Sequence, residues 1–256
     1  MDNFTLYSPT YFVFGKGEEN STGKYVRRFG GTKVLLHYGG GSAIRSGLLA
    51  RVKASLTAEG IAFTELGGVR PNPRSGLVYK GIRMCREENV DFVLAVGGGS
   101  AIDSSKAIAA GAVYEGDFWD FYQGKPVEHA LPIGTVLTIA AAGSESSNSC
   151  VITNEKTGEK RAYDDDVARP KFAVMNPELT LTLPDYQTES GCTDIMMHTM
   201  ERYFTATADM ELTDAIAEAL LRTVMENAKI LHTRPDDYKA RAEAMWAGSL
   251  AHNGLT

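Results

Sequence analysis

Residues 91–106 read Asp-Phe-Val-Leu-Ala-Val-Gly-Gly-Gly-Ser-Ala-Ile-Asp-Ser-Ser-Lys, and they are the most informative stretch of the chain. A run of β-forming residues ends in Gly97, Gly98 and Gly99, and Ser100 then opens a helical segment. Glycines let a ligand approach the backbone closely, and a helix N-terminus offers unpaired N–H groups with partial positive charge. The turn is therefore predicted to seat a pyrophosphate; a turn that serves packing alone is the alternative. Neither the G-x-G-x-x-G nor the G-x-x-x-x-G-K-[ST] motif occurs.

Short apolar runs alternate with amphipathic stretches over the first two thirds of the chain. Strands are predicted at 32–38, 61–66, 91–96 and 132–138, and helices at 75–88 and 101–113. A further helix after Gly39-Gly40-Gly41-Ser42 is predicted to bury one face, made of Ile44, Leu48, Leu49, Val52 and Leu56. This alternation predicts right-handed βαβ crossovers and a mostly parallel sheet. Ligands bind such sheets beyond the carboxyl ends of the strands, where both Gly-rich turns fall.

The character of the sequence changes near residue 184. Leu183-Pro184 breaks the pattern, and the chain then becomes rich in Ala, Leu, Glu and Met with helical spacing. Helices are predicted at about 187–206, 211–231 and 236–256. Residues 1–183 are therefore interpreted as an α/β domain and residues 184–256 as the start of an all-helical domain. The final apolar helix needs partners to cover it, so the natural chain is expected to continue and the helical domain to be incomplete here.

The overall composition excludes several classes of protein. The 256 residues carry a formal net charge of −6, which argues against a nucleic-acid partner or an anionic membrane surface. The three cysteines are far apart and form neither a disulfide framework nor a C-x-x-C pair, as in a reducing compartment. No run approaches the ~20 apolar residues of a membrane span, and the first residues lack the features of a signal peptide. A cytoplasmic globular protein is expected.

A second motif, Gly191-Cys192-Thr193-Asp194-Ile195-Met196-Met197-His198, places Asp194 and His198 four residues apart. On a helix both side chains project from one face. A carboxylate oxygen and an imidazole at this spacing can supply half of a four-ligand site for Fe²⁺ or Zn²⁺. An ordinary surface Asp–His pair is the alternative, although the apolar neighbours favour a buried pair with a purpose such as metal binding.

Together these motifs resemble the iron-containing alcohol dehydrogenase family, and in particular its branch of NADPH-dependent butanol dehydrogenases and broad-range aldehyde reductases. The resemblance spans essentially the whole chain. It rests on the following segments: Tyr11–Gly15, Tyr38–Ser42, Pro71-Asn72-Pro73, Gly97–Ser100 with Asp103 and Lys106, Thr138–Glu145, Asp194 with His198, and Met245-Trp246-Ala247. The resemblance implies a Rossmann-like N-terminal domain, a helical C-terminal domain of the dehydroquinate synthase-like type, and a cleft between them. It also implies a homodimer.

The resemblance also assigns roles to individual residues. Gly98, Gly99 and Ser100 would hold the pyrophosphate of a nicotinamide cofactor, and Asp103 would lie near that cofactor. Thr138 and Ser147 would contact its adenine or ribose side. Lys160 matches a lysine that reaches the cofactor, with a solvated turn lysine as the alternative. The family completes its metal site with two histidines downstream of Asp194 and His198. Neither His232 nor His252 aligns with them, so this chain is expected to bind metal weakly.

The choice of cofactor can be argued from the first Gly-rich turn. Proteins that prefer NAD usually place a carboxylate after the second strand, where it accepts a hydrogen bond from the ribose 2′-OH. Here that position holds Gly39, Gly40, Gly41 and Ser42, followed by Arg45. Backbone N–H groups, a hydroxyl and a guanidinium suit a 2′-phosphate better. NADP(H) is therefore predicted over NAD(H).

The predicted reaction is the metal-dependent interconversion of butanol-like primary alcohols and their aldehydes with NADP(H), in which a Lewis acid stabilises the developing alkoxide. Two other functions remain open. One is an NAD-dependent polyol dehydrogenase of the glycerol type, or a relative of dehydroquinate synthase. The other is a non-catalytic NADP-binding fragment that lacks two metal ligands.

Overall fold

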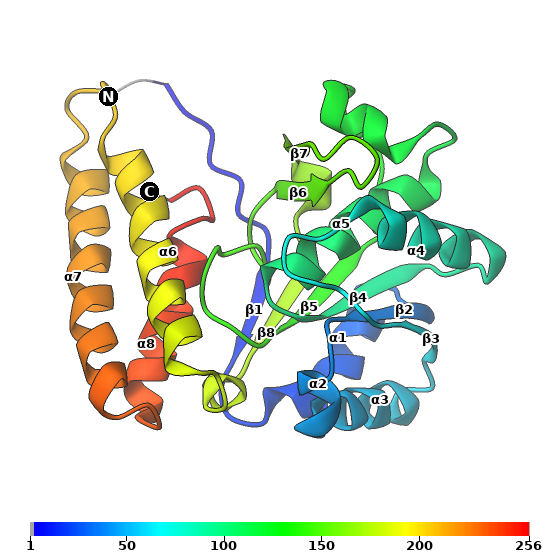
Figure 1. Cartoon of the computed structure of the whole chain (residues 1–256), viewed down its shortest axis with the longest axis horizontal. Helices are drawn as coiled ribbons and strands as arrows, with labels where there is room; N and C mark the ends of the chain where they lie inside the picture. The colour runs from blue at the N-terminus through cyan, green and yellow to red at the C-terminus, as the bar shows by residue number, and fades with distance from the viewer. Residues whose placement is uncertain (1–2, 256) are drawn as a thin grey trace.

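The computed structural model describes residues 3–255, which form an α/β layer and a separate layer of helices (Figure 1). The core of the α/β layer is a six-stranded sheet in the order β1-β8-β5-β4-β2-β3, with every neighbouring pair parallel. Its strands are β1 (Tyr11–Phe14), β2 (Lys33–Tyr38), β3 (Ala62–Leu66), β4 (Phe92–Gly97), β5 (Ile133–Leu137) and β8 (Phe172–Met175). The predicted parallel sheet is confirmed, and β1 and β8 join it beyond the four strands that the alternating pattern predicted.

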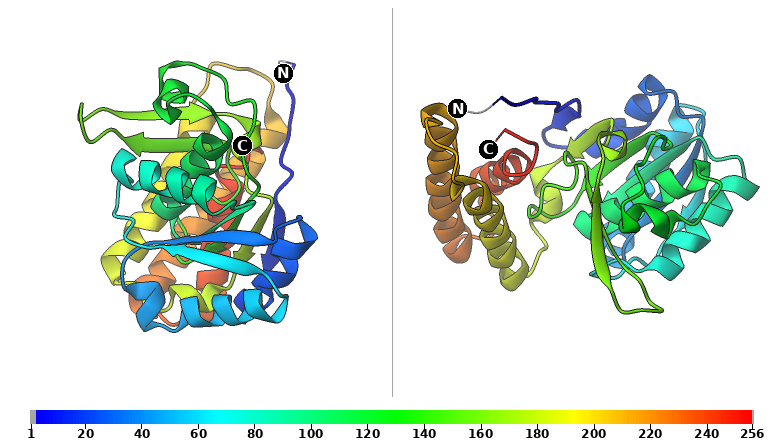
Figure 2. Two further views of the ribbon diagram at one scale, coloured as in Figure 1. Left: turned by 90° about the vertical axis from the view of Figure 1, so that its right-hand side faces the viewer. Right: turned by 90° about the horizontal axis from the view of Figure 1, so that it is seen from above.

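Helices cover both faces of this sheet (Figures 1 and 2). One face carries α1 (Thr22–Arg28), α2 (Ser42–Arg45) and α3 (Leu48–Ala58), and the other carries α4 (Ser75–Glu87) and α5 (Gly99–Val113). Because side chains alternate across a strand, Leu36 packs into the core beneath α3, whereas Leu35 packs into the core beneath α4 and α5. Both faces are therefore buried, which is why the central strands are continuous apolar runs.

An antiparallel hairpin and short 3₁₀ turns complete the α/β layer. The hairpin pairs β6 (Ser149–Thr153) with β7 (Lys160–Asp164), and β6 packs against α5. The 3₁₀ turns are η1 (Glu18–Ser21), η2 (Phe118–Gln123), η3 (Asp166–Ala168) and η4 (Pro177–Thr180). The hairpin brings residues far along the chain to the helix that follows the central glycine turn.

The second layer consists of α6 (Asp185–Tyr203), α7 (Glu211–Thr233) and α8 (Tyr238–Leu250), which lie beside the sheet as a separate group (Figure 2). These helices share an apolar core of their own that includes Ile195, Leu220 and Val224. The predicted fold class, a Rossmann-like α/β layer followed by helices, is confirmed. No helix among residues 3–255 is both long and apolar enough to cross a bilayer.

Three details differ from the sequence predictions. Gly47 adopts a left-handed conformation (φ 71°) that separates α2 from α3, so the single predicted helix is wrong and Ile44 is 56% exposed. Helix α8 ends at Leu250, because the chain turns at Gly254 (φ 93°) rather than continuing as a helix. Helix α5 begins at Gly99, one residue before Ser100, which was expected to open it.

Candidate functional site

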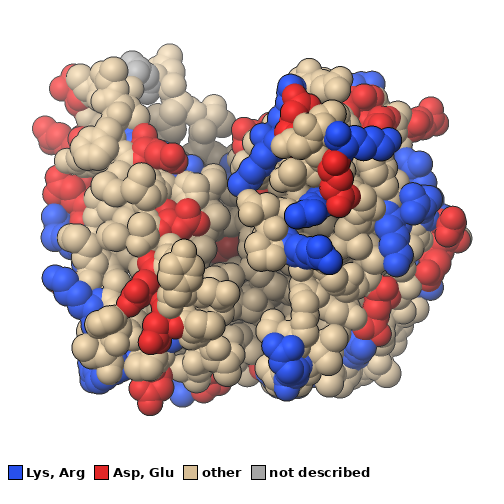
Figure 3. All heavy atoms as spheres, viewed as in Figure 1, with Lys and Arg blue, Asp and Glu red and all other residues tan. Residues whose placement is uncertain are grey.

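A cleft of about 1080 Å³ lies between the carboxyl ends of the strands and helix α6. The surface is visibly hollowed between the helical layer and the α/β layer (Figure 3). Both Gly-rich turns, the loop after β5 and the exposed face of α6 line the cleft. The prediction that the two glycine turns meet at one site is therefore consistent with the structure.

The central turn builds a close-approach surface at the start of α5. Gly98 is the N-cap residue in an extended conformation, and a Cβ added there would overlap the Cγ2 of Ile139. Gly97, Gly98, Gly99 and Ser100 all line the cleft. The first N–H groups of a helix have no acceptor within the helix and carry partial positive charge. This part of the cleft suits an anionic group pressed against bare backbone.

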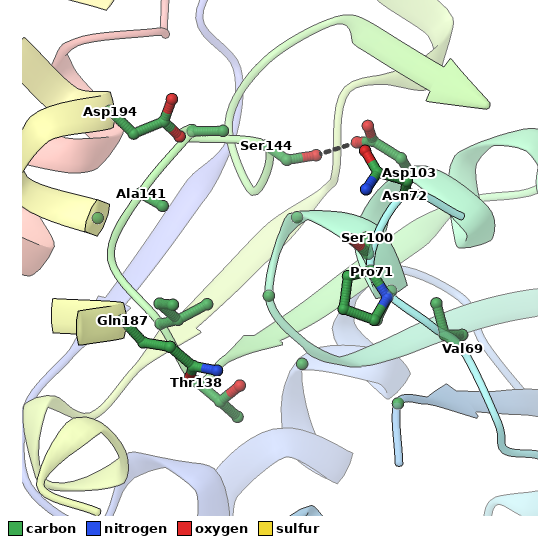
Figure 4. A pocket seen from close by; sticks show the side chains of 18 of the residues that line it. Val69, Pro71, Asn72, Ser100, Asp103, Thr138, Ala141, Ser144, Gln187 and Asp194 are labelled. Atoms are coloured by element: carbon green, nitrogen blue, oxygen red, sulfur yellow. Dashed lines mark hydrogen bonds between the residues drawn. The ribbon is translucent and has the colours of Figure 1, made fainter. Parts of the chain in front are cut away.

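Asp103, one turn into α5, also lines the cleft. Its Oδ1 accepts a hydrogen bond from the Ser144 hydroxyl at 2.5 Å, which is drawn in Figure 4, and its Oδ2 accepts from the Val151 N–H at 3.1 Å. Burial raises the pKa of the Asp103 carboxyl, while the ammonium of Lys106 and the Ser144 hydroxyl oppose that rise. The predicted position of Asp103 at the cleft is consistent with this geometry.

Thr138 and Lys160 reach the cleft from opposite walls. Thr138 follows β5, and its N–H donates to the Gly97 carbonyl at 3.1 Å, which joins the end of β5 to the end of β4. Lys160 opens β7 and donates to the Asn72 side-chain oxygen at 2.9 Å, across the cleft mouth. Both residues line the cleft, and their contact with a cofactor stays a prediction.

The first Gly-rich turn contributes Gly39, Gly40 and Ser42 to the cleft. No acidic side chain of this turn lies there; the nearest strand carboxylate, Glu65, instead pairs with Lys53 at 2.6 Å. The Arg45 guanidinium lies directly against Gly41. This end of the cleft therefore carries backbone and hydroxyl groups, and the Arg45 guanidinium lies beside Gly41 outside the cleft lining.

Two of the residues predicted to contact cofactor are not in the cleft wall. Ser147 is only 1% exposed, and its hydroxyl and carbonyl oxygens accept hydrogen bonds from Lys106. Gly41 lies behind Gly40 and Ser42 and is covered by Arg45. Ser147 therefore acts on the site through Lys106, because its side chain faces the interior of the protein.

Helix α6 presents the Asp–His pair. Asp194 lines the cleft, and its Oδ1 lies 3.7 Å from the His198 Nε2. The His198 ring packs against the His252 ring with centroids 4.6 Å apart, and the His252 Nδ1 donates to the Ala142 carbonyl at 2.8 Å. Burial lowers the pKa of His252 to about 4, with the positive charge of Arg202 as the next cause. His252 is therefore a neutral neighbour that supports the His198 ring.

Asp194 and His198 supply one oxygen and one nitrogen donor on adjacent turns of α6, which suits two positions of a divalent-metal site. Within the described part of the chain, no three His, Cys, Asp or Glu side chains gather closely enough to hold a metal ion. His232 is no third donor, since it pairs with Glu189 at 2.6 Å on the far turn of α6. The residues present thus fit a metal in part, with two donors of the four required.

Sequence reasoning did not predict that the segment between β5 and β6, residues 138–148, joins the two layers. Gly191 of α6 has no side chain because a Cβ there would overlap the Ala140 carbonyl oxygen. From α8, the Ser249 hydroxyl donates to the buried Glu145 carboxylate at 2.5 Å. The run of serines at 144, 146, 147 and 149 was the one signal in the sequence that could have indicated a polar network here.

The glycine-lined start of α5 and Asp194 of α6 thus line one cleft between an α/β layer and a helical layer. The chain belongs to the iron-containing alcohol dehydrogenase family. The model of that family matches residues 9–177, and the model of its C-terminal region matches residues 188–256. The resemblance identified from the motifs is confirmed.

Named relatives agree with this assignment. The chain is 49% identical to NADH-dependent butanol dehydrogenase A of Clostridium acetobutylicum, over all of this chain and 66% of the relative. It is 40% identical to the NADPH-dependent aldehyde reductase YqhD of Escherichia coli, again over all of this chain and 66% of the relative. The crystal structure of NADH-dependent butanol dehydrogenase A from Thermotoga maritima matches with a TM-score of 0.97 at 42% identity, over all of this chain and 64% of that one. The chain therefore spans about two thirds of the length of these relatives.

Proposed function

We propose that the protein is a metal-dependent alcohol dehydrogenase and aldehyde reductase that interconverts butanol-like primary alcohols and aldehydes with NADP(H). The observation that carries this proposal is that the glycine-lined start of α5 and Asp194 line the same cleft, with His198 lying 3.7 Å from Asp194 on the next turn of α6. The names of the relatives, which are butanol dehydrogenases and an aldehyde reductase, support it.

The cofactor would bind along the carboxyl ends of the strands. Gly97, Gly98, Gly99 and Ser100 would hold its pyrophosphate, since the backbone there is bare and the start of α5 favours negative charge. Asp103 and Thr138 would contact it from the two walls, and Lys160 would reach it from the hairpin. This path leads from the first Gly-rich turn toward Asp194.

NADP(H) is favoured over NAD(H) by the end of β2. The relatives include both NADH- and NADPH-dependent proteins, so family membership alone does not select one. Gly39 and Gly40 offer backbone and Ser42 a hydroxyl in the cleft, and Arg45, which lies against Gly41 outside the cleft lining, would have to turn its guanidinium toward a 2′-phosphate. Replacement Gly39→Asp would introduce the missing carboxylate, and we expect it to reverse the ratio of the NADPH and NADH dissociation constants.

Asp194 and His198 would hold the metal, Fe²⁺ or Zn²⁺, through a carboxylate oxygen and the imidazole Nε2. When bound, such an ion supplies Lewis-acid polarisation of the substrate oxygen. The chain's own residues orient these ligands: His252 packs on the His198 ring, and Gly191 lets α6 approach the Ala140 carbonyl. With two donors, residues 1–256 alone are expected to bind metal weakly and to turn over slowly.

The test is butanal-dependent oxidation of NADPH by the protein. We expect His198→Ala to abolish turnover while NADPH still binds, because His198 lies on α6 and not at the start of α5. The matched control is His129→Ala, an exposed loop histidine, which should leave turnover unchanged. Glycerol-dependent reduction of NAD without butanal activity would favour the polyol dehydrogenase, and cofactor binding without turnover would favour the non-catalytic reading.

A further inference from the structure

Lys106 is a fully buried lysine that the proposed reaction does not use; burial lowers its pKa, and the nearby Asp103 carboxyl opposes that shift. Lys106 lies on α5 one turn after Asp103 and has 0% exposure. Its Nζ donates to four oxygen atoms: Ser144 Oγ at 3.1 Å, Ser147 carbonyl at 3.0 Å, Ser147 Oγ at 3.2 Å and Ser149 carbonyl at 2.8 Å. A buried charge is costly unless it is fully hydrogen-bonded. The segment 144–149 therefore wraps around this one cation.

The direction of the hydrogen bonds follows from the chemistry of the groups. An ammonium can only donate, so the Ser144 oxygen accepts from Lys106. The single proton of the Ser144 hydroxyl is then directed to Asp103 Oδ1, 2.5 Å away. Figure 4 shows Ser144 and Asp103 facing each other across the cleft wall. The chain of bonds runs from Lys106 through Ser144 to Asp103, and each link requires Asp103 to accept.

We propose that Lys106 is a positioning residue of the cofactor site, which acts through Ser144 to hold Asp103 as an ionised hydrogen-bond acceptor at the cleft. The Val151 N–H occupies Asp103 Oδ2 from the opposite side, so the carboxylate is fixed at both oxygens. Its remaining lone pairs are available to a donor group of the bound dinucleotide. A protonated Asp103 would break this pattern, because its O–H would itself need an acceptor. The Ser144 oxygen already accepts from Lys106, and Val151 presents an N–H donor.

Other groups near Asp103 also bear on its charge. From β7, Lys160 favours the ionised form, while β6 contributes Cys150 and the Val151 N–H. Tyr122 of η2 is hydrogen-bonded to Cys150, and Tyr163 of β7 lies close to Cys150. Both phenols are neutral, because burial raises their pKa values well above the ordinary range. The further charged groups around Lys106 are Glu145 and Arg169. Lys106 is the cation that contacts the Ser144–Asp103 pair directly.

The test is a carbon-13 NMR titration of the Asp103 carboxyl, assigned with Asp103→Asn, in variants of the 256-residue chain. We expect Lys106→Met to raise the Asp103 pKa by about one to three pH units, the usual effect of losing a close opposite charge. Ser144→Ala should also raise the Asp103 pKa, but by a smaller amount. This variant keeps the other acceptors of Lys106, so it replaces Lys106→Met in the test if Lys106→Met does not fold. Ser105→Ala is the matched control, because the buried Ser105 hydroxyl donates to the Ala101 carbonyl in the preceding turn of α5. An Asp103 pKa unchanged in both Lys106→Met and Ser144→Ala would overturn the proposal.

A second readout, which rests on the proposed function, is the pH dependence of the NADPH dissociation constant. In Lys106→Met, NADPH should bind at least several-fold more weakly near pH 6 than near pH 8, while Lys106→Arg should restore the wild-type profile. A merely structural lysine would change the melting temperature without changing this profile. If the wild-type chain bound neither NADPH nor NADH, the proposed function would fail, whereas the NMR titration would still decide the role of Lys106.

Discussion

His37 should make the folded protein measurably less stable in mild acid. It lies on β2 with 0% exposure; its Nδ1 donates to the Leu66 carbonyl at 2.7 Å, and its Nε2 accepts from the Ser104 hydroxyl at 2.8 Å. These bonds tie α5, which carries the glycine turn, to β2 and β3. Burial lowers the pKa of His37 to about 4, so the folded protein keeps the ring neutral.

The sign and size follow from linkage between protonation and folding. In the unfolded chain His37 titrates near 6.5, so below that pH the unfolded state binds a proton that the folded state does not. The stability contributed by the neutral ring is present above pH 6.5 and is lost as the pH falls toward 4. At about 1.4 kcal/mol per pH unit, the loss is about 2 kcal/mol between pH 7 and pH 5, and about 3 kcal/mol in total.

The assay is urea unfolding followed by circular dichroism at pH 7 and pH 5, with wild type and His37→Asn compared. We expect His37→Asn to be less stable than wild type at both pH values. Between pH 7 and pH 5, however, its free energy of unfolding should fall by about 2 kcal/mol less than that of wild type. Asp103 and Glu145, whose pKa values burial raises, titrate alike in both proteins and cancel in this difference. The exposed His129→Asn should show the wild-type slope. Equal slopes for wild type and His37→Asn would refute the reasoning.

Three further predictions follow from the packing. Gly98→Ala should lower the free energy of unfolding, measured by thermal unfolding, by about 1–3 kcal/mol, because the added Cβ overlaps Ile139. Gly99→Ala should lower it by less, because the added Cβ would lie 3.8 Å from the Ser144 Cβ. Equal losses for the two variants would contradict the steric argument. Gly191→Ala should also lower the melting temperature, since its Cβ meets the Ala140 carbonyl; an unchanged melting temperature would show that α6 can move away freely. All three cysteines are buried, and burial raises the pKa of Cys85 and Cys150 to about 12, so a thiol reagent at pH 8 should label the native chain only at the rate of unfolding.

The main sheet and the sites at its edge could be predicted from local patterns. Apolar runs that end in glycine predicted the strands β2 and β4 and the turns that line the cleft, because strand burial and turn chemistry depend on adjacent residues. The spacing of Asp194 and His198 likewise placed both on one face of α6. These features depend on residues close in the sequence.

The parts that sequence reasoning missed depend on contacts between distant residues. The hairpin β6–β7 has a mixed polar pattern, and Lys160 and Arg161 hide its strand character. Ser147 was assigned to the cofactor, but Lys106, 41 residues earlier, draws its oxygens inward. Gly191 has no local reason to be glycine, and its role becomes visible only when Ala140 lies against it. Ile44 was assigned to a buried helix face because the break at Gly47 was not anticipated.

The central claim, that this cleft is an NADP(H) site, is tested most directly by calorimetric titration of the 256-residue chain with NADPH and with NADH. We predict saturable binding at one site, tighter for NADPH than for NADH, and weakened by Gly98→Ala. Absence of saturable binding for both dinucleotides would contradict the claim, and tighter binding of NADH would contradict the part that rests on Gly39, Ser42 and Arg45.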